Sequence, residues 1–174
     1  MCARSCNGVE LARAGHDSYV LTIRAYGPAD YEAVVSLADR LATGRPAWRD
    51  HDRWLAAVRG WVSGSVQTAG EPGHALFVAS DGDRVAGFAS VSSRAHFSGD
   101  VDAYIGELVV AEWAEGRGVG RALVQTAEEW ASSNGHARLT LETGAANHRA
   151  LRLYAEAGYE AEDVRLTKQL RPPA

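Results

Sequence analysis

The chain has 174 residues, of which 46% are hydrophobic and 23% are charged, an ordinary balance for a globular protein. Its formal net charge of −4, from 22 acidic and 18 basic residues, argues against nucleic acid as the main partner, because nucleic-acid sites need an excess of basic charge. There is no run of eighteen apolar residues and no apolar core in the first twenty residues, so we expect neither a membrane span nor a secretory signal, and we expect a cytoplasmic location.

Hydrophobic periodicity and turn residues divide the chain into ten predicted elements. Runs of β-branched and aromatic residues predict strands, apolar residues spaced three and four apart predict helices, and Gly, Pro, Asn and Asp mark the turns. In chain order, the elements are a strand at 19–26, a helix at about 30–41, a helix that starts near 50 or 52, strands at 75–80, 84–93 and 102–110, a helix at 118–133, a strand at 138–143, a helix at 147–157 and a strand at 164–170. The order β-α-α-β-β-β-α-β-α-β predicts an α/β fold in which helices flank a mixed sheet, and it excludes a helix bundle or a β-sandwich.

Residues 1–18 show little apolar periodicity and are interpreted as a loose leader, followed by a single domain at 19–170. Both cysteines, Cys2 and Cys6, lie in this leader and support neither a disulfide framework nor a structural zinc site. No pair of the six histidines has the spacing of metal ligands, so we expect no metal.

The sharpest local feature is a glycine-rich turn at residues 115–121, Glu-Gly-Arg-Gly-Val-Gly-Arg, between an apolar strand and an amphipathic helix. Glycines let the backbone approach a ligand, and the free N–H groups of a helix's first turn favour phosphate. Arg117 and Arg121 can add charge-assisted contacts. The G-x-G-x-G spacing does not fit a dinucleotide fingerprint, and Arg121-Ala122 stands where a P-loop needs Lys and Ser or Thr. The remaining alternative is a turn that needs glycine only for packing.

This region resembles motif A of the GNAT superfamily of N-acetyltransferases, Arg/Gln-x-x-Gly-x-Gly/Ala after a strand of ELxV type. The matching residues are Glu107-Leu108-Val109-Val110 and Glu115-Gly116-Arg117-Gly118-Val119-Gly120. Glu115 departs from the Arg or Gln of that motif. Residues 147–159 resemble motif B, N-x-x-A-x-x-x-Y-x-x-x-G-F/Y. The resemblance is specific over 105–159, whereas residues 27–75 match no motif.

The resemblance implies acetyl-CoA as the acetyl donor and a central sheet that splays beside the strand at 102–110. It implies that the glycine turn binds the coenzyme pyrophosphate mostly through backbone amides, and that the backbone of the preceding strand pairs with the pantetheine arm. Asn147 is expected to contact the arm, or alternatively to cap the following helix. The expected coenzyme-binding residues are Leu108, Val109, Val110, Glu115, Gly116, Arg117, Gly118, Val119, Gly120, Arg121 and Asn147.

Two residues are predicted to be catalytic. Tyr154 matches the family tyrosine that protonates the departing coenzyme A thiolate, and its alternative role is an aromatic on the buried face of a helix. Glu107, an acid within an apolar strand, is our prediction for the base that takes a proton from the acceptor, directly or through a water. The alternatives are a structural carboxylate at Glu107, a base at Tyr104 or Asp102, and a backbone carbonyl in the place of a dedicated base.

The acceptor is predicted to be the primary amine of a small polar, cationic molecule, attacked directly in a ternary complex. An aminoglycoside-like antibiotic, a polyamine and an amino-acid derivative all fit, because the acceptor loop is aromatic and acidic and can hold a cation. The expected acceptor residues are Trp48, Asp52, His96 and Tyr104. For Trp48 and Asp52 the alternatives are a core Trp pair and a helix cap, and for His96 the alternative is turn chemistry. Other functions left open are acetylation of a protein N-terminus or lysine, and a non-catalytic acyl-CoA-binding module. Dimers are common in the family, so a homodimer is also implied.

Overall fold

A computed structural model describes residues 20–170, so the expected leader and its cysteines lie outside the described residues. Its sheet has five strands in the order β1-β2-β3-β4-β5. The strands are β1 (Leu21–Ala25), β2 (His74–Asp81), β3 (Arg84–Ala95), β4 (Val101–Val110) and β5 (Leu139–Leu141). The first four pair antiparallel, and β5 pairs with β4 in parallel, which confirms the predicted mixed sheet.

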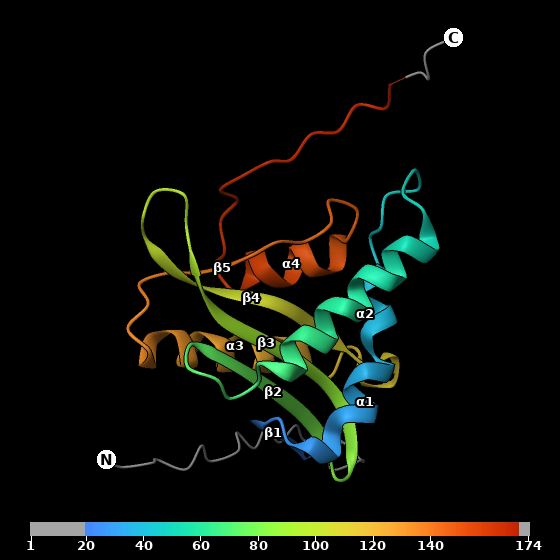
Figure 1. Cartoon of the computed structure of the whole chain (residues 1–174). Helices are drawn as coiled ribbons and strands as arrows, with labels where there is room; N and C mark the ends of the chain where they lie inside the picture. The colour runs from blue at the N-terminus through green and yellow to red at the C-terminus, as the bar shows by residue number, and fades with distance from the viewer. Residues whose placement is uncertain (1–19, 171–174) are drawn as a thin grey trace.

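Helices cover both faces of this sheet, with α2 running diagonally across the front and α3 behind it (Figure 1). The α-helices are α1 (Tyr31–Ser36), α2 (His51–Gln67), α3 (Val119–Ser133) and α4 (His148–Glu156), and the short 3-10 helices are η1 (Pro28–Asp30), η2 (Ala38–Ala42) and η3 (Glu112–Ala114). The helix expected at about 30–41 is therefore divided, because the chain tightens into a 3-10 helix after α1. The other helices begin and end close to the predicted residues. No helix between residues 20 and 170 is long and apolar enough to cross a membrane.

The apolar core has one cluster on each face of the sheet. Val119 and Leu123 of α3 pack against Ile105 of β4 on one face, and Val62 of α2 packs with Val109 of β4 on the other. β4 therefore contributes side chains to the core on both faces of the sheet.

A β-bulge interrupts β4 in its middle. Ala89 of β3 pairs with Leu108 and Val91 pairs with Ile105, so that two residues of β4, Gly106 and Glu107, stand opposite one residue of β3. The bulge lets Glu107 point to the same face as Val109, toward α2.

The sheet splays beyond the bulge. β5 pairs with β4 only at residues 103–105, whereas β4 continues to Val110. In the described part of the chain, residues 107–110 have no partner strand on the β5 side. The resemblance predicted this open edge, and the sequence placed it beside the glycine turn that follows.

The strand predicted at 164–170 is wrong. Residues 160–170 have no strand assignment and extend away from the fold as an exposed segment (Figure 1, red). Their apolar side chains Val164, Leu166 and Leu170 are 79%, 88% and 80% exposed. Alternating apolar and polar residues show strand propensity, but a strand forms only where a neighbouring strand and a buried face receive it. Within the described residues, no strand pairs with this segment and its apolar side chains are not buried.

An ion pair between the half-exposed Arg24 and the buried Asp30 joins β1 to the start of α1 and yields a prediction about stability. Asp30 is 5% exposed, accepts from Arg24 at 2.6 and 2.7 Å, and accepts from the backbone N–H of Gly27 at 2.9 Å. The hydrogen bonds from Arg24 hold the pKa of Asp30 below its usual range. Asp30→Asn should therefore lower the free energy of unfolding at neutral pH by about 2 kcal/mol, measured by urea denaturation.

The pH dependence gives this prediction its control. A carboxyl whose pKa is lowered by folding stabilises above its unfolded pKa of about 4, and that stability is lost as pH falls through the folded value. The difference between the parent and Asp30→Asn should thus shrink on acidification. Asp39→Asn, whose bonds to Arg59 lie on the surface, should change stability much less. An equal loss for both variants would contradict the argument.

Candidate active site

Glu107 is a buried carboxylate held by two serine hydroxyls. The residue is 5% exposed, and its Oε2 accepts from Ser65 Oγ of α2 at 2.7 Å and also from Ser90 Oγ of β3. Ser90 Oγ in turn accepts from the backbone N–H of Glu107 at 3.0 Å. These contacts are those of a structural carboxylate, which is the alternative role for Glu107. Both side-chain bonds end on Oε2, however, so Oε1 keeps its lone pairs for a further donor.

The backbone beyond the bulge alternates in direction. Arg40 Nε donates to Val110 O at 2.6 Å, so this carbonyl points away from β3. Val109 O lies against Gly87 of β3. In an antiparallel pair, neighbouring residues present their polar groups to opposite sides, so Leu108 joins Val110 on the open edge. Of the three residues predicted to pair with an added strand, these two have the required orientation.

The glycine turn has the geometry of a phosphate cradle. Gly116 and Gly118 adopt φ of 76° and 83°, a left-handed conformation that favours glycine. A Cβ added at either residue would meet nothing within 4 Å, so the turn is open to a ligand. Gly118 begins α3 without a side-chain cap, which leaves the first-turn N–H groups for an anion. These residues fit a pyrophosphate group.

Gly120 has a different role from the other glycines of the turn. A Cβ there would lie 3.2 Å from Leu153 Cδ2 of α4 and 3.6 Å from Val110 Cγ2. The packing alternative therefore holds at this position, where the first turn of α3 meets α4. The part of the turn that is open to a ligand is therefore limited to residues 116–119 and the first-turn N–H groups of α3.

The two arginines of the turn have partners elsewhere. Arg121 forms an ion pair with Glu156 at 2.7 Å, and the Arg117 guanidinium lies 5.6 Å from the Trp113 ring centroid. Two other arginines, Arg40 of η2 and Arg149 of α4, donate to the carboxylate of Glu115. Neither arginine is apparent from the sequence motif, because they lie 75 and 34 residues from Glu115.

Tyr154 lies on the buried face of α4. It is 9% exposed, its ring centroid lies 5.7 Å from that of Tyr159, and burial raises its pKa to about 12. A hydroxyl with such a pKa stays protonated at neutral pH, which a proton donor requires. Both of its predicted roles are compatible with this position.

Asn147 is the N-cap of α4. Its Oδ1 accepts from the backbone N–H of Ala150 at 3.2 Å, which confirms the capping alternative. A Cβ added to Gly44 would lie 2.9 Å from Asn147 Cβ. The loop between η2 and α2 therefore packs onto the start of α4.

Two alternative bases lie further along β4. Tyr104 is half-buried beneath Arg94, whose Cζ lies 4.4 Å from the ring centroid, and burial raises its pKa. A tyrosine with a raised pKa keeps its proton at neutral pH, so it cannot accept one from the acceptor. Asp102 accepts from Arg138 Nε at 2.8 Å, so its carboxylate already has a cationic partner. Between residues 20 and 170, Glu107 pairs with no cationic side chain, which favours it among the three.

The start of α2 lies far from Glu107. Asp50 caps the helix by accepting from the backbone N–H of Arg53 at 2.8 Å, which confirms the capping alternative for one acid of this loop. Trp48 and Asp52 are exposed. Thirteen residues separate Asp52 from Ser65, which is roughly 20 Å along a helix. The structure does not bring these predicted acceptor residues to the carboxylate.

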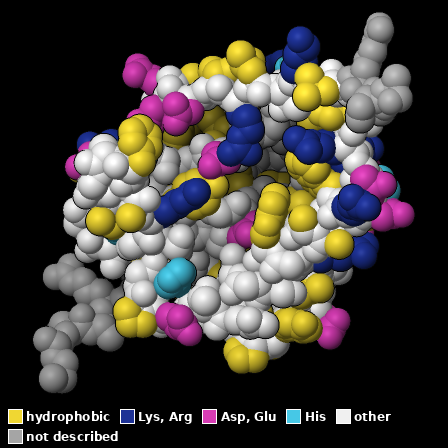
Figure 2. Space-filling model, turned by 45° about the horizontal axis from the view of Figure 1, so that its top comes forward, with side chains coloured by type: hydrophobic (Ala, Val, Ile, Leu, Met, Phe, Trp, Pro, Cys, Tyr) yellow, Lys and Arg dark blue, Asp and Glu magenta, His cyan; other side chains and the backbone are white. Residues whose placement is uncertain are grey.

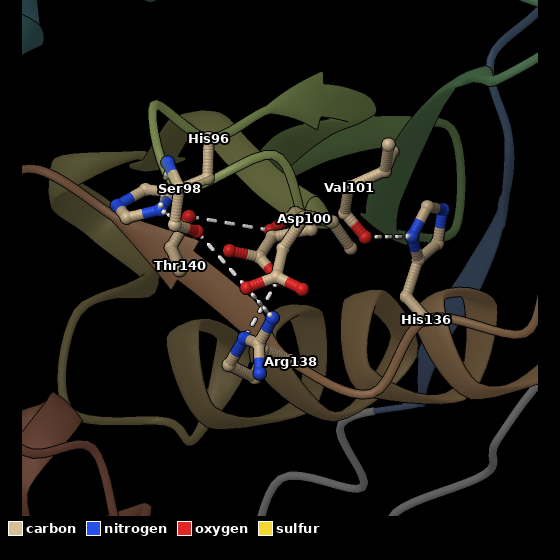
Figure 3. A network of polar contacts seen from close by, with 9 residues as sticks. His96, Ser98, Asp100, Val101, His136, Arg138 and Thr140 are labelled. Atoms are coloured by element: carbon tan, nitrogen blue, oxygen red, sulfur yellow. Dashed lines mark hydrogen bonds and ion pairs between the residues drawn. The ribbon is translucent and has the colours of Figure 1, made fainter.

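His96 joins a polar network in the turn between β3 and β4 (Figure 3). Its Nδ1 lies 2.7 Å from Ser98 Oγ, which donates to Asp100 at 3.0 Å, and Asp100 pairs with Arg138 at 2.9 Å. Along β3, His96 lies six residues beyond Ser90, roughly 20 Å away. The contacts of His96 are therefore those of a turn residue, and the structure does not bring His96 to Glu107.

Trp61 of α2 has an exposed indole on the helix face that carries Ser65. It precedes Ser65 by four residues, so both side chains lie on one face of α2. Ser65 reaches Glu107, whereas the Trp61 side chain is 54% exposed. Figure 2 shows one face of the molecule, hollowed at its centre, with hydrophobic, arginine and acidic side chains around the hollow.

Three comparisons relate this geometry to known proteins. The model of the acetyltransferase (GNAT) family matches residues 33–159. A mycothiol acetyltransferase of Jonesia denitrificans is 37% identical over 86 residues, which are 49% of this chain and 26% of that protein. The chain thus spans about a quarter of the length of this relative.

Two solved structures share the fold. A protein of Pyrococcus furiosus, provisionally named an acetyl transferase, has a TM-score of 0.69 and 26% identity, covering 86% of this chain and 99% of its own. AAC(6')-Iy in complex with the bisubstrate analogue CoA-S-monomethyl-acetylneamine has a TM-score of 0.63 and 20% identity, covering 87% and 99%. The second likeness concerns the fold alone.

Proposed function

This chain belongs to the acetyltransferase (GNAT) family, and we propose that it transfers an acetyl group from acetyl-CoA to the primary amine of a small polar, cationic molecule in a ternary complex. The observation that carries the proposal is Glu107, a buried carboxylate at the bulge of β4. The open backbone edge of Leu108 and Val110 follows it directly, and the glycine turn follows that edge.

Each part of this arrangement has a chemical task. When bound, acetyl-CoA supplies an activated thioester carbonyl. The turn at 116–119 holds the pyrophosphate, and the open edge of β4 orients the arm. Glu107 Oε1 accepts a proton from the acceptor amine, directly or through a water, so that the attacking nitrogen is neutral. The Tyr154 hydroxyl donates a proton to the leaving thiolate.

Charge and aromatic surface support a cationic acceptor. Glu107 supplies a carboxylate, and Trp61 supplies an exposed indole one helical turn from the serine that holds it. A cation is attracted both to a carboxylate and to the face of an indole. The aminoglycoside acetyltransferases among the structural relatives share the fold and do not identify the acceptor.

The direct test is turnover of acetyl-CoA against a panel of amines, read by release of free thiol. The panel should contain aminoglycosides, polyamines, amino-acid derivatives, and peptides with a free N-terminus or lysine. Thiol release with small cationic amines is expected. Release with peptides alone would favour the protein acetyltransferase alternative. Silence across the panel, with coenzyme still binding, would favour a non-catalytic acyl-CoA-binding module.

The position of Trp61 makes a prediction about acceptor affinity. Trp61→Ala should raise KM for the amine by about fivefold and leave KM for acetyl-CoA unchanged, because a partly desolvated cation–π contact contributes on the order of 1 kcal/mol. Steady-state kinetics with the best amine of the panel measures both values. Trp48→Ala is the discriminating variant, since Trp48 is equally exposed and lies in the loop that precedes α2. A larger effect at Trp48 would move the acceptor site to the loop.

A further inference from the structure

Glu115 is an acid at the start of a phosphate-binding turn, where a cation would be expected. Its two carboxylate oxygens have different partners: Oε1 accepts from Arg40 Nη2 of η2, and Oε2 accepts from Arg149 Nη1 of α4. These contacts join segments separated by 75 and 34 residues in the sequence. Glu115 therefore holds two arginines from opposite sides of the turn.

Arg40 also occupies the open edge of β4. Its Nε donates to Val110 O at 2.6 Å, and this is the carbonyl that an added strand would use. The guanidinium thus lies where the edge that would pair with the arm meets the turn that would hold the phosphates. An incoming coenzyme meets Arg40 at this junction.

Arg149 lies over the first turn of α3. It precedes Leu153 by four residues on α4, so the two side chains share a face. Leu153 Cδ2 lies 3.2 Å from the Cβ position of Gly120 in that turn. The face of α4 that carries Arg149 thus contacts the first turn of α3, whose N–H groups have no side-chain cap.

The charges of this cluster favour exchange of its anion. Two guanidinium groups and one carboxylate leave one net positive charge, and all three side chains are between 31% and 62% exposed. Ion pairs at such exposure contribute little to stability, so they can be given up. A pyrophosphate offers more negative charge and pairs with planar guanidinium groups through two parallel hydrogen bonds.

From this geometry we propose that Arg40 and Arg149 are the cationic ligands of the coenzyme pyrophosphate, and that Glu115 is an internal anion that holds them until the pyrophosphate displaces it. The proposal rests on the proposed function, because it takes the turn to bind coenzyme A. It assigns the phosphate contacts to these two arginines in place of Arg117 and Arg121.

The test is calorimetric binding of coenzyme A, dephospho-coenzyme A and pantetheine to the full chain and its variants. Arg149→Gln should weaken coenzyme A by about tenfold, since it removes a charge-assisted contact. Glu115→Gln should instead tighten coenzyme A by several fold, because it removes the competing anion. Dephospho-coenzyme A should follow both changes, whereas pantetheine, which has no phosphate, should follow neither. Arg149→Lys should recover part of the affinity as a point charge.

Arg59→Gln is the matched control, because it removes an exposed arginine of α2 that pairs with Asp39 of η2, and it should leave all three affinities unchanged. If Arg149→Gln and Glu115→Gln both weaken, or both tighten, the binding of coenzyme A, the ion pairs have a structural role. That result would overturn this inference and leave the proposed function standing. Unchanged affinity in both variants, or pantetheine weakened as much as coenzyme A, would also overturn it. Failure of the unsubstituted chain to bind coenzyme A would overturn the proposed function together with the inference.

Discussion

Glu107→Gln is expected to lower kcat for acetyl transfer by about a hundredfold or more, the usual contribution of a positioned general base. Glutamine has nearly the same volume, and its amide oxygen can accept the hydrogen bonds from Ser65 and Ser90 that the carboxylate accepts now. It cannot take a proton from the amine. Thiol release under saturating amine measures the loss, and calorimetry should show that coenzyme A still binds.

Ser65→Ala separates the base from its support. It removes one of the two hydroxyls on Oε2 and leaves Oε1 untouched, so kcat should fall by less than about tenfold. A Glu107→Gln enzyme with nearly full kcat would contradict the assignment. That result would return the task to a backbone carbonyl or a water.

Tyr154→Phe is the second large effect, and kcat should fall by about a hundredfold while both KM values change little. In the proposed mechanism the hydroxyl donates a proton to the departing thiolate, and its pKa of about 12 keeps it protonated at neutral and moderately basic pH. Activity that depends on this proton should therefore show no basic limb until the pH rises toward that value. Phenylalanine retains the ring contact with Tyr159 and the buried packing, so the variant should fold.

Tyr159→Phe is the control for this experiment. Tyr159 is the ring neighbour of Tyr154, and burial and the charge of Glu128 raise its pKa. Removal of its hydroxyl should leave kcat unchanged if Tyr154 is the donor. Equal turnover by the parent and Tyr154→Phe would mean that the thiolate leaves without help from this residue.

Glu107→Gln and Tyr154→Phe also distinguish an enzyme from a non-catalytic binding module, because a module would have no turnover to lose. If Glu107→Gln and Tyr154→Phe each abolish turnover while coenzyme A still binds, the protein is an enzyme that acts on an acceptor. The identity of that acceptor then comes from the amine panel, and the Trp61→Ala variant locates it on the α2 face.

The sequence by itself determined the elements and the cradle. Strands and helices follow from periods of two and 3.6 residues, and the caps at Asp50 and Asn147 lie where the sequence predicts them, because these signals involve neighbours along the chain. The glycines at 116 and 118 are equally local, since a left-handed φ depends on the residue itself. The strand at 164–170 was wrong for the same reason: propensity is local, whereas pairing is not.

Only the tertiary structure decided which side chains meet. The bulge turns Glu107 toward Ser65, 42 residues earlier, and packing brings Arg40 and Arg149 to Glu115. It also keeps His96 in its turn, away from the carboxylate. Such contacts depend on how two layers of helices fit one sheet, and no spacing along the chain encodes them. The sequence therefore determined where the glycine turn lies, and the fold determined which charges surround it.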